Sequence, residues 1–237
     1  SYLADELLRN SFNIIIADTQ KPKINHPKQK FVKVNILNLE SIKSVIKGAE
    51  AVYNLASLAN LDDAAKDPLQ TININVMGNL NLLEACRING KIKRFIYASS
   101  AYALSNKGSF YGISKQLSEK LTIEYQDKFN LKYTIIRYGS VYGERAYQNN
   151  YIYQLLYHAI KYGELCFKGD GEDTREFIHA SDVAKLSVKV LKDKEFENVN
   201  VILTGMEKIK RIELLNMINE IMQNKFKIKK IKKKLTG

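Results

Sequence analysis

Tyr111 and Lys115 are the residues whose types and spacing point most directly to chemistry. They stand at positions i and i+4 of a segment with a helical pattern, so both side chains are expected on one helix face, roughly 5 to 6 Å apart. A neighbouring ammonium favours phenolate and is expected to lower the pKa of Tyr111 from about 10 toward working pH, as a general base requires. Ser100, at the end of the strand-like run 94–100, is placed to hold a substrate hydroxyl against that phenolate, with Ser99 as the competing serine. Tyr-x-x-x-Lys alone is more often packing than catalysis, so the surrounding elements decide.

Those elements are expected to alternate between strands and helices. Asp67 and Pro68 supply an N-cap and a first-turn proline for a helix that continues to Gly90, and a second long helix is expected over 111–129. Alternating strands and helices predict an α/β fold with a parallel, doubly wound sheet, whose ligands bind at the carboxyl ends of the strands. The predicted strands cover 12–18, 31–34, 51–55, 95–98, 133–137 and 199–203, and the later helices cover 147–162, 181–191 and 211–224.

Several ordered motifs beyond the Tyr-Lys pair carry a family resemblance. They are the runs Tyr53 to Ser57, Asn75 to Ala85, Arg137 to Arg145 and Gly169 to Ala184. With these motifs the chain resembles the extended short-chain dehydrogenase/reductase family, in its NAD-dependent nucleotide-sugar epimerase/dehydratase branch, of which UDP-glucose 4-epimerase is a familiar member. The resemblance runs through most of the chain.

The resemblance implies a Rossmann-like domain and a smaller α/β substrate lobe. The NAD-binding domain is expected over 1–143, with about 172–203 folding back onto it, and the partial substrate lobe over 144–171 and 204–237. Ser1 to Leu8 matches the helix that follows the family's glycine loop, so the first strand and that loop are expected to be missing and the chain to be a fragment trimmed at both ends. Such a fragment is expected to bind NAD poorly. The family also implies a homodimer.

The resemblance places a cofactor site at the strand ends. Asp18 ends a strand where the family's carboxylate accepts hydrogen bonds from the adenosine ribose, and a carboxylate there favours NAD over NADP; the alternative is an Asp that merely starts a loop. Asn35 and Ile36 match a pair near the adenine. The full set of expected NAD contacts is Asp18, Asn35, Ile36, Leu55, Ala56, Ser57, Asn75, Ala98, Tyr111, Lys115 and Tyr138.

The resemblance also implies a nucleotide-diphosphate sugar as substrate. Arg175 falls on the arginine that clamps the diphosphate, for which a guanidinium fork is suited. The expected substrate contacts are Ser100, Tyr111, Ser140 and Arg175. The expected reaction is epimerisation through a transient 4-keto sugar, with Tyr111, Lys115 and Ser100 catalytic.

Other reactions and other kinds of protein stay open. Ala101 and Tyr102 stand where nucleotide-sugar dehydratases resemble one another in carrying an acid pair, so dehydration is discounted, as is decarboxylation. A reductase or dehydrogenase of the same family is the close alternative. A non-catalytic dinucleotide-binding protein and a basic binding module are the alternatives from other classes.

Composition narrows these classes further. The chain has 237 residues, 45% of them hydrophobic, which is ample for a packed core, and a formal net charge of +12. Lysines are spread along the chain, and only the tail 225–234 is a true basic cluster, so a solvated surface is favoured over nucleic-acid binding. The sequence shows no membrane-spanning run and no signal peptide, which predicts a cytoplasmic protein. Cys86, Cys166, His158 and His179 lack metal-ligand spacing, so no metal is expected.

Overall fold

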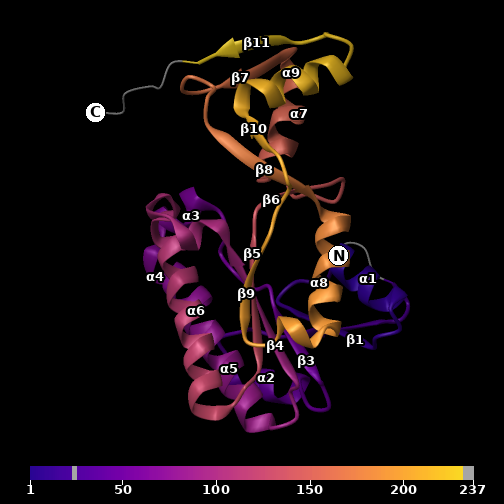
Figure 1. Cartoon of the computed structure of the whole chain (residues 1–237), viewed down its shortest axis with the longest axis vertical. Helices are drawn as coiled ribbons and strands as arrows, with labels where there is room; N and C mark the ends of the chain where they lie inside the picture. Colours follow the sequence, from indigo (N-terminus) through magenta and orange to yellow (C-terminus); the bar gives the residue numbers. More distant parts are fainter. Residues whose placement is uncertain (23–25, 232–237) are drawn as a thin grey trace. The chain divides into compact units, whose positions relative to one another are not determined.

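The computed structural model describes residues 1–22 and 26–231 and divides the chain into two units (Figure 1). Unit 1 consists of Ser1–Tyr138 and Ser181–Leu203, and unit 2 consists of Gly139–Ala180 and the chain from Thr204 onward. The chain therefore passes from one unit to the other after Tyr138 and after Ala180, rather than at the predicted positions 143 and 172. The reason is strand β8 (Thr174–His179), which pairs with β6 (Ser140–Tyr142) and β10 (Lys208–Lys210) and so joins unit 2.

Unit 1 is built on parallel strands, which confirms the predicted α/β class. Its four-stranded sheet has the order β3-β4-β5-β9, and every pairing in it is parallel. These strands are β3 (Ala51–Asn54), β4 (Arg94–Ser100), β5 (Tyr133–Tyr138) and β9 (Val199–Leu203). Strands β1 (Ile14–Asp18) and β2 (Gln29–Lys33) form a separate parallel pair. All six strands overlap the segments predicted from apolar runs.

The helices of unit 1 follow the expected end signals. Asp67 caps α4 by accepting a hydrogen bond from the Gln70 amide at 2.9 Å, Pro68 opens it, and Gly90 ends α5 with φ of 66°. The helix predicted between these caps is interrupted by a π-helical turn, Asn73–Met77. The helices are α1 (Tyr2–Arg9), α2 (Leu39–Val45), α3 (Leu61–Lys66), α4 (Pro68–Ile72), α5 (Gly78–Asn89), α6 (Ser109–Phe129) and α8 (Ala180–Lys192), with a 3₁₀ turn at Lys194–Phe196.

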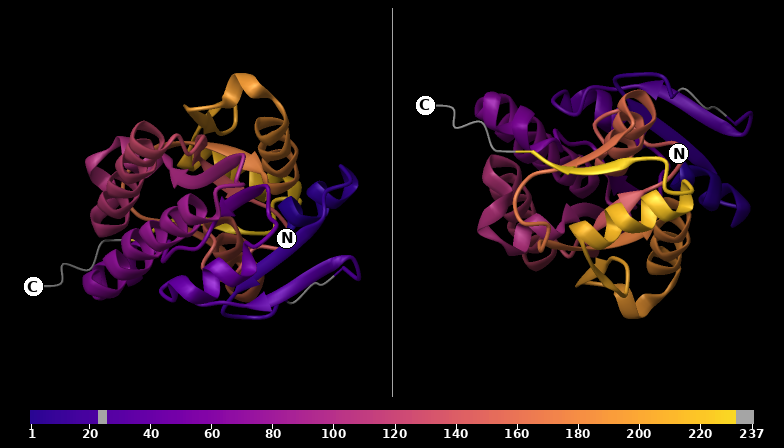
Figure 2. Two further views of the ribbon diagram at one scale, coloured as in Figure 1. Left: turned by 90° about the horizontal axis from the view of Figure 1, so that it is seen from below. Right: turned by 90° about the horizontal axis from the view of Figure 1, so that it is seen from above.

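The two central strands of the four-stranded sheet, β4 and β5, are covered on both faces. Alternate residues of β4 point to opposite sides, so Phe95 and Tyr97 join a core with α5 residues, whereas Ile96 joins Ile136 and Val190 of α8 in another. Figure 1 and the left view of Figure 2 show α5 and α6 on one side of the sheet and α8 on the other. Burial on both faces explains why these strands are continuous apolar runs.

Unit 2 has its own small core. Its strands form a three-stranded sheet, β10-β8-β6, and a parallel pair of β7 (Glu164–Phe167) and β11 (Lys227–Lys230). Helices α7 (Tyr151–Tyr162) and α9 (Arg211–Ile221) pack against these strands through Leu155, Leu165 and Leu215. Helix α7 begins later than predicted because Asn150 caps it through the Ile152 amide.

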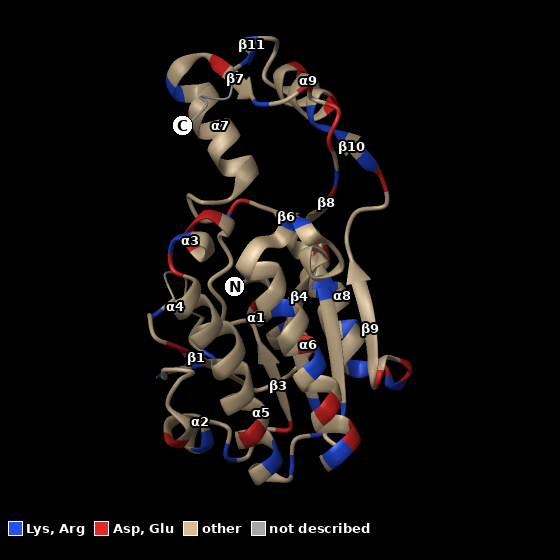
Figure 3. Cartoon of the chain, turned by 90° about the vertical axis from the view of Figure 1, so that its left-hand side faces the viewer, with Lys and Arg blue, Asp and Glu red and all other residues tan. Residues whose placement is uncertain are grey.

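Basic and acidic residues are mixed along the helices of unit 1, whereas basic residues concentrate on β10 and β11 of unit 2 (Figure 3). Strand β11 lies in the basic tail, whose last residues, 232–234, fall outside the described part of the chain. Within the described residues, no helix is long and apolar enough to cross a membrane.

Candidate active site

Tyr111 and Lys115 lie in the first turns of α6, against the carboxyl end of β4. The Lys115 ammonium donates a hydrogen bond to the Ala98 carbonyl oxygen at 2.7 Å and lies 5.6 Å from the centre of the Tyr111 ring. It also lies 5.0 Å from the centre of the Tyr97 ring. Tyr111, Lys115 and Ser100 are all buried, with exposures of 8%, 3% and 8%. The structure therefore brings the three predicted catalytic residues together at one strand end.

The connection from β4 to α6 holds Ser100 beside Tyr111. It consists of two 3₁₀ turns, Ala101–Leu104 and Asn106–Gly108, and the Ser100 hydroxyl caps the first by accepting from the Tyr102 amide at 3.2 Å. A Cβ on Gly112 would stand 3.1 Å from the Tyr102 carbonyl oxygen, so glycine permits this close approach. The Tyr102 and Tyr111 rings then meet edge to face, 6.4 Å apart.

The acid-base properties of the pair differ from the sequence expectation. The pKa of Tyr111 is raised rather than lowered, because burial outweighs the opposing effect of the Ser100 hydroxyl, while Tyr102 raises it further. Burial also lowers the pKa of Lys115 to about 7, against a smaller opposing effect of Glu119. The predicted lowering by Lys115 thus fails in the protein alone: its ammonium is directed at the Ala98 carbonyl, and near neutral pH it is only partly charged.

An ion pair beside Lys115, formed by the buried Glu119 and the partly buried Arg137, was missed by the sequence reasoning. Glu119 accepts two hydrogen bonds from Arg137 of β5, Nε to Oε1 at 2.9 Å and Nη2 to Oε2 at 2.6 Å. The Ser99 hydroxyl also donates to Glu119, so Ser99 is engaged away from Tyr111. The available signal was spacing, because Glu119 follows Lys115 by four residues on the face that carries Tyr111.

Asn75 ties the segment after β3 to α6. Its side-chain oxygen accepts from the Leu58 amide at 2.7 Å and from the Ser57 hydroxyl at 3.1 Å. Its amide group donates to the Leu58 carbonyl at 3.1 Å and to Ser114 of α6 at 2.9 Å. Asn75 is buried and its hydrogen bonds go to protein groups, whereas Leu55 and Ala56 on the segment that it supports are exposed.

Asp18, Asn35 and Ile36 lie at the carboxyl ends of β1 and β2. The Asp18 carboxylate is exposed, and both of its hydrogen bonds, from the Gln20 amide and the Thr19 hydroxyl, reach the same oxygen, Oδ1. Asn35 accepts from the Leu37 amide at 3.0 Å. Ile36 contacts Gly78, where an added Cβ would stand 2.7 Å from its side chain.

Tyr138 ends β5, opposite Ser100 in the sheet register. Its hydroxyl is hydrogen-bonded to Ser187 of α8 at 3.0 Å, and burial raises its pKa to about 12. The side chain therefore joins the core on the α8 face, away from α6.

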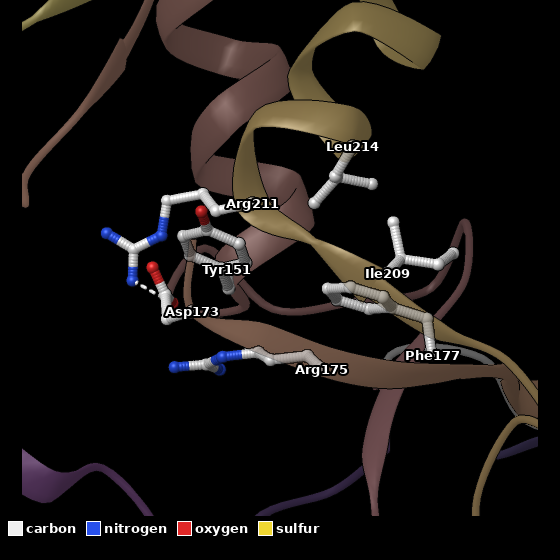
Figure 4. Close-up of a pocket in the computed structure, with 7 residues that line it drawn as sticks. All are labelled: Tyr151, Asp173, Arg175, Phe177, Ile209, Arg211 and Leu214. Carbon is white, nitrogen blue, oxygen red and sulfur yellow. Dashed lines mark hydrogen bonds and ion pairs between the residues drawn. The ribbon is translucent and has the colours of Figure 1, made fainter. Parts of the chain in front are cut away.

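In unit 2, Arg175 lines a small pocket together with Tyr151, Asp173 and Arg211 (Figure 4). The Arg211 guanidinium is paired with Asp173 at 2.5 Å and donates to the Lys168 carbonyl at 2.8 Å. The Arg175 guanidinium lies 5.2 Å from the centre of the Tyr151 ring. Within residues 1–22 and 26–231 the Arg175 guanidinium has no ion pair, so its hydrogen-bond donors are available to an anion.

The other predicted unit 2 contact, Ser140, opens β6 and pairs with Phe177 of β8. His179 of β8 lies 3.5 Å from Glu144, and His158 is hydrogen-bonded to the Glu164 carbonyl. No group of three potential metal ligands occurs among the described residues.

Comparison with known proteins gives matches in both sequence and structure. The model of the NAD dependent epimerase/dehydratase family matches residues 1–202. A protein of Methanocaldococcus jannaschii that carries the provisional name UDP-glucose 4-epimerase is 30% identical over 223 residues, which cover 85% of this chain and 72% of that protein.

Solved structures show the same fold. A UDP-glucose 4-epimerase from Thermotoga maritima, solved with UDP-glucose, superposes with a TM-score of 0.89 at 22% identity, over 99% of this chain and 82% of that one. A UDP-glucuronic acid 4-epimerase from Bacillus cereus, solved with UDP-glucuronic acid and NAD, gives 0.88 at 23% identity, over 98% and 82%. These likenesses confirm the predicted Rossmann-like fold class.

Proposed function

Because this chain belongs to the NAD dependent epimerase/dehydratase family, we propose that it epimerises the sugar of a nucleotide-diphosphate sugar through a transient 4-keto intermediate. The main support for the proposal is that Tyr111, Lys115 and Ser100 are all buried and lie close together at the carboxyl end of β4. This is the edge of a parallel sheet where ligands bind. The family is NAD dependent, as predicted.

The donors and acceptors present fit NAD. Lys115 makes one hydrogen bond, to the Ala98 carbonyl, and among the described residues no other oxygen takes its two further N–H groups, which suit ribose hydroxyls. Asp18 leaves Oδ2 without a partner within the described chain, which suits the adenosine ribose. The exposed backbone at Leu55 and Ala56 gives further contact area. NAD, when bound, supplies the hydride chemistry by accepting hydride from the sugar carbon and returning it to the opposite face.

The protein's own residues handle the proton. Tyr111 accepts the proton of the sugar 4-hydroxyl as the carbon loses hydride, and it returns that proton when the ketone is reduced. Ser100 orients the hydroxyl against the Tyr111 oxygen, because Ser99 is already engaged with Glu119. Lys115 promotes phenolate at Tyr111 to the extent that its amine is protonated, so activity is expected to depend on pH near the Lys115 pKa of about 7.

Arg175 is proposed to bind the diphosphate. Its planar fork matches phosphate oxygens, and the Tyr151 ring supports the guanidinium without using its donors. Ser140 is proposed as a further sugar contact. Because the two matched solved epimerases were obtained with UDP-sugars, UDP-sugars are the first substrates to try.

The alternatives predict different products. A reductase or dehydrogenase would consume or accumulate NADH, and a non-catalytic dinucleotide-binding protein would give no turnover. Dehydration is discounted, because Ala101 and Tyr102 stand where the dehydratases of the family carry a pair of acidic residues. Tyr102 instead packs edge to face on Tyr111.

A homodimer in the cytoplasm is also proposed. Helix α6 exposes Phe110, Ile113 and Leu117, with exposures of 40%, 54% and 42%, and the neighbouring α4 exposes Leu69. Spacing of i, i+3 and i+7 gives one apolar stripe, of the kind that marks an interface. Ile113→Asp should leave a monomer in light scattering, whereas a wild-type monomer would contradict the proposed dimer.

The proposed cytoplasmic location agrees with the state of the cysteines, because both are free thiols, as suits a reducing compartment.

The test of the reaction uses the chain within the full-length product of its gene. The protein is incubated with NAD and a panel of UDP-, GDP- and dTDP-sugars, and products are read by NMR beside Tyr111→Phe. A new epimer without net NADH, lost in the variant, is the expected result. Net NADH change would favour the reductase, and tight NAD binding without turnover of any sugar would favour the non-catalytic protein.

A further inference from the structure

Glu119 stands at the junction of three elements next to the proposed reactive residues. It is 6% exposed, and it accepts hydrogen bonds from Ser99 of β4 and from two donors, Nε and Nη2, of Arg137 on β5. Ser99 and Arg137 are partners in the sheet register, so a single carboxylate joins two adjacent strands to α6.

Three successive residues at the end of β4 each interact with a residue of α6. Lys115 bonds to the Ala98 carbonyl and Glu119 bonds to Ser99, while Ser100 acts on Tyr111. Three successive strand residues thus meet three helix residues spaced by four. Of these three helix residues, Glu119 also bonds to Arg137 of β5 and so connects α6 to both strands.

We propose that Glu119 is a positioning residue for the proposed reaction: through Ser99 and Arg137 it fixes α6 against β4 and β5, and thereby fixes where Lys115 and Tyr111 stand relative to Ser100. The inference rests on the proposed function. A buried ion pair adds little net stability compared with an apolar contact of the same size, so fixing geometry explains its place better than stability does.

The charge of Glu119 acts on the same group. Lys115 is almost completely buried, and the Glu119 carboxylate raises its pKa against the larger lowering effect of burial. The titratable and charged groups on the elements packed against α6 are Asp62, Asp63 and Lys66 of α3, Glu84, Cys86 and Arg87 of α5, Arg94 and Tyr97 of β4, Tyr102 and Lys107 of the 3₁₀ turns, and Tyr133, Arg137 and Tyr138 of β5. Among these groups, Tyr97 has its ring 5.0 Å from the Lys115 ammonium, and Arg137 reaches the neighbourhood through Glu119.

Glu119→Gln tests the charge, with Glu197→Gln as the matched control. Glu197 pairs with the buried Arg94 at 2.8 Å, at the other end of β4. The titration midpoint of Lys115 is read in the cofactor-free protein from the NMR signals of lysines labelled with ¹³C at Cε, assigned with Lys115→Met. In Glu119→Gln the midpoint should fall by roughly one pH unit, because a compensating negative charge is lost. In Glu197→Gln it should stay at the wild-type value.

Two further variants test position separately from charge. Glu119→Asp keeps the charge but shortens the reach, and Arg137→Lys keeps the charge but removes the fork. Each should lower kcat about tenfold or more through misplacement of Tyr111 and Lys115, with KM nearly unchanged. Both should leave the Lys115 midpoint near its wild-type value, and Glu197→Gln should leave kcat unchanged.

The outcomes separate this inference from the proposed function. If the wild-type protein epimerises no sugar, the proposed function fails, while the Lys115 midpoints still report whether Glu119 acts on the site. The positioning role is overturned if Glu119→Asp and Arg137→Lys lower the melting temperature but leave kcat at the Glu197→Gln level. If Glu119→Gln does not fold, Ser99→Ala, which keeps the ion pair, should still lower kcat, and an unchanged kcat there overturns the role as well.

Discussion

An arginine–glutamate pair lies near each end of strand β4, with one partner of each pair buried, and the two ends differ in what lies beside the pair. At the amino end, Arg94 contacts Glu197 at 2.8 Å and Thr134 at 2.9 Å, and Lys132 adds a second ion pair to Glu197. At the carboxyl end, Glu119 of the Glu119–Arg137 pair acts on Lys115, and burial displaces the pKa values of both Lys115 and Tyr111. The ion pair at the amino end is therefore expected to serve structure alone, whereas the pair at the carboxyl end borders the groups proposed to react, where parallel sheets bind ligands.

Of the variants that distinguish the two ends of β4, Tyr111→Phe should lower kcat the most. Loss of the hydroxyl removes the proposed base, so kcat is expected to fall by about 10² to 10⁴-fold, while the retained ring preserves packing and the melting temperature. Steady-state kinetics and thermal melting of the same samples are the measurements.

Tyr125→Phe is the matched control on the same helix. Its hydroxyl is hydrogen-bonded to Glu84 at 3.0 Å, toward the far end of α6 from Tyr111. It should keep wild-type turnover. A Tyr111→Phe enzyme within tenfold of the wild-type rate would show that Tyr111 is not the base.

Lys115→Met should abolish turnover and yet raise the free energy of unfolding at acidic pH. The folded pKa of Lys115 is about 7, below the unfolded value of about 10.4, so between these values the unfolded chain binds more protons and wild-type stability rises with pH. Below pH 7 the full cost of burying the ammonium is present. The variant should therefore gain on the order of 2 kcal/mol near pH 6, and the gain should shrink toward pH 10, while turnover is lost.

Urea unfolding across this pH range measures the effect. Lys120→Met, at an exposed position of the same helix, is the control and should show no gain that depends on pH. Equal pH profiles for wild type and Lys115→Met would mean that Lys115 is not a buried, titrating amine.

The two ends of β4 show which features of the site can be predicted from the sequence and which cannot. An apolar run predicted β4 and a helical pattern predicted α6, and together they predicted that Tyr111 and Lys115 would lie near Ser100. The sequence could not supply the pKa of Tyr111, because that depends on how deeply the ring is buried. The spacing of four residues from Lys115 places Glu119 on the helix face that carries Tyr111, but it does not identify Arg137 as its partner, because that contact joins a helix to a strand and exists only once both are packed.

The boundary between the units shows the same limit. From the sequence, no strand is predicted over 174–179 and this segment is expected in the NAD-binding domain, whereas its pairing with β6 and β10 assigns it to unit 2. The π-helical turn at Asn73–Met77 likewise interrupts a segment whose pattern reads as one helix.

Glu197→Gln should weaken the amino end without affecting the carboxyl end. It leaves Arg94, which is 4% exposed, without its charged partner, and Glu197 itself is partly exposed, so the expected cost is about 1 to 2 kcal/mol. Because its partners lower the pKa of Glu197, this stability is present above the unfolded pKa of about 4.3 and is lost as pH falls through the lower folded value. The difference between wild type and variant should therefore vanish in acid, which melting curves at several pH values would show. A fall in kcat at neutral pH would contradict a purely structural role.

Ser99→Ala and Thr134→Val form the most closely matched pair, since each removes one hydroxyl that is hydrogen-bonded to an ion pair. Ser99 donates to Glu119, while Thr134 accepts from Arg94 at 2.9 Å and donates to the Phe196 carbonyl. Ser99→Ala should cost about 1 kcal/mol, because one buried hydrogen bond disappears, and Thr134→Val, which removes two, should cost about twice as much. Only Ser99→Ala is expected to lower kcat, by a few-fold, because the carboxylate that it releases is the one that positions Lys115 and Tyr111. Equal effects of the two variants on kcat, after correction for the folded fraction, would mean that the two ends of β4 do not differ in function.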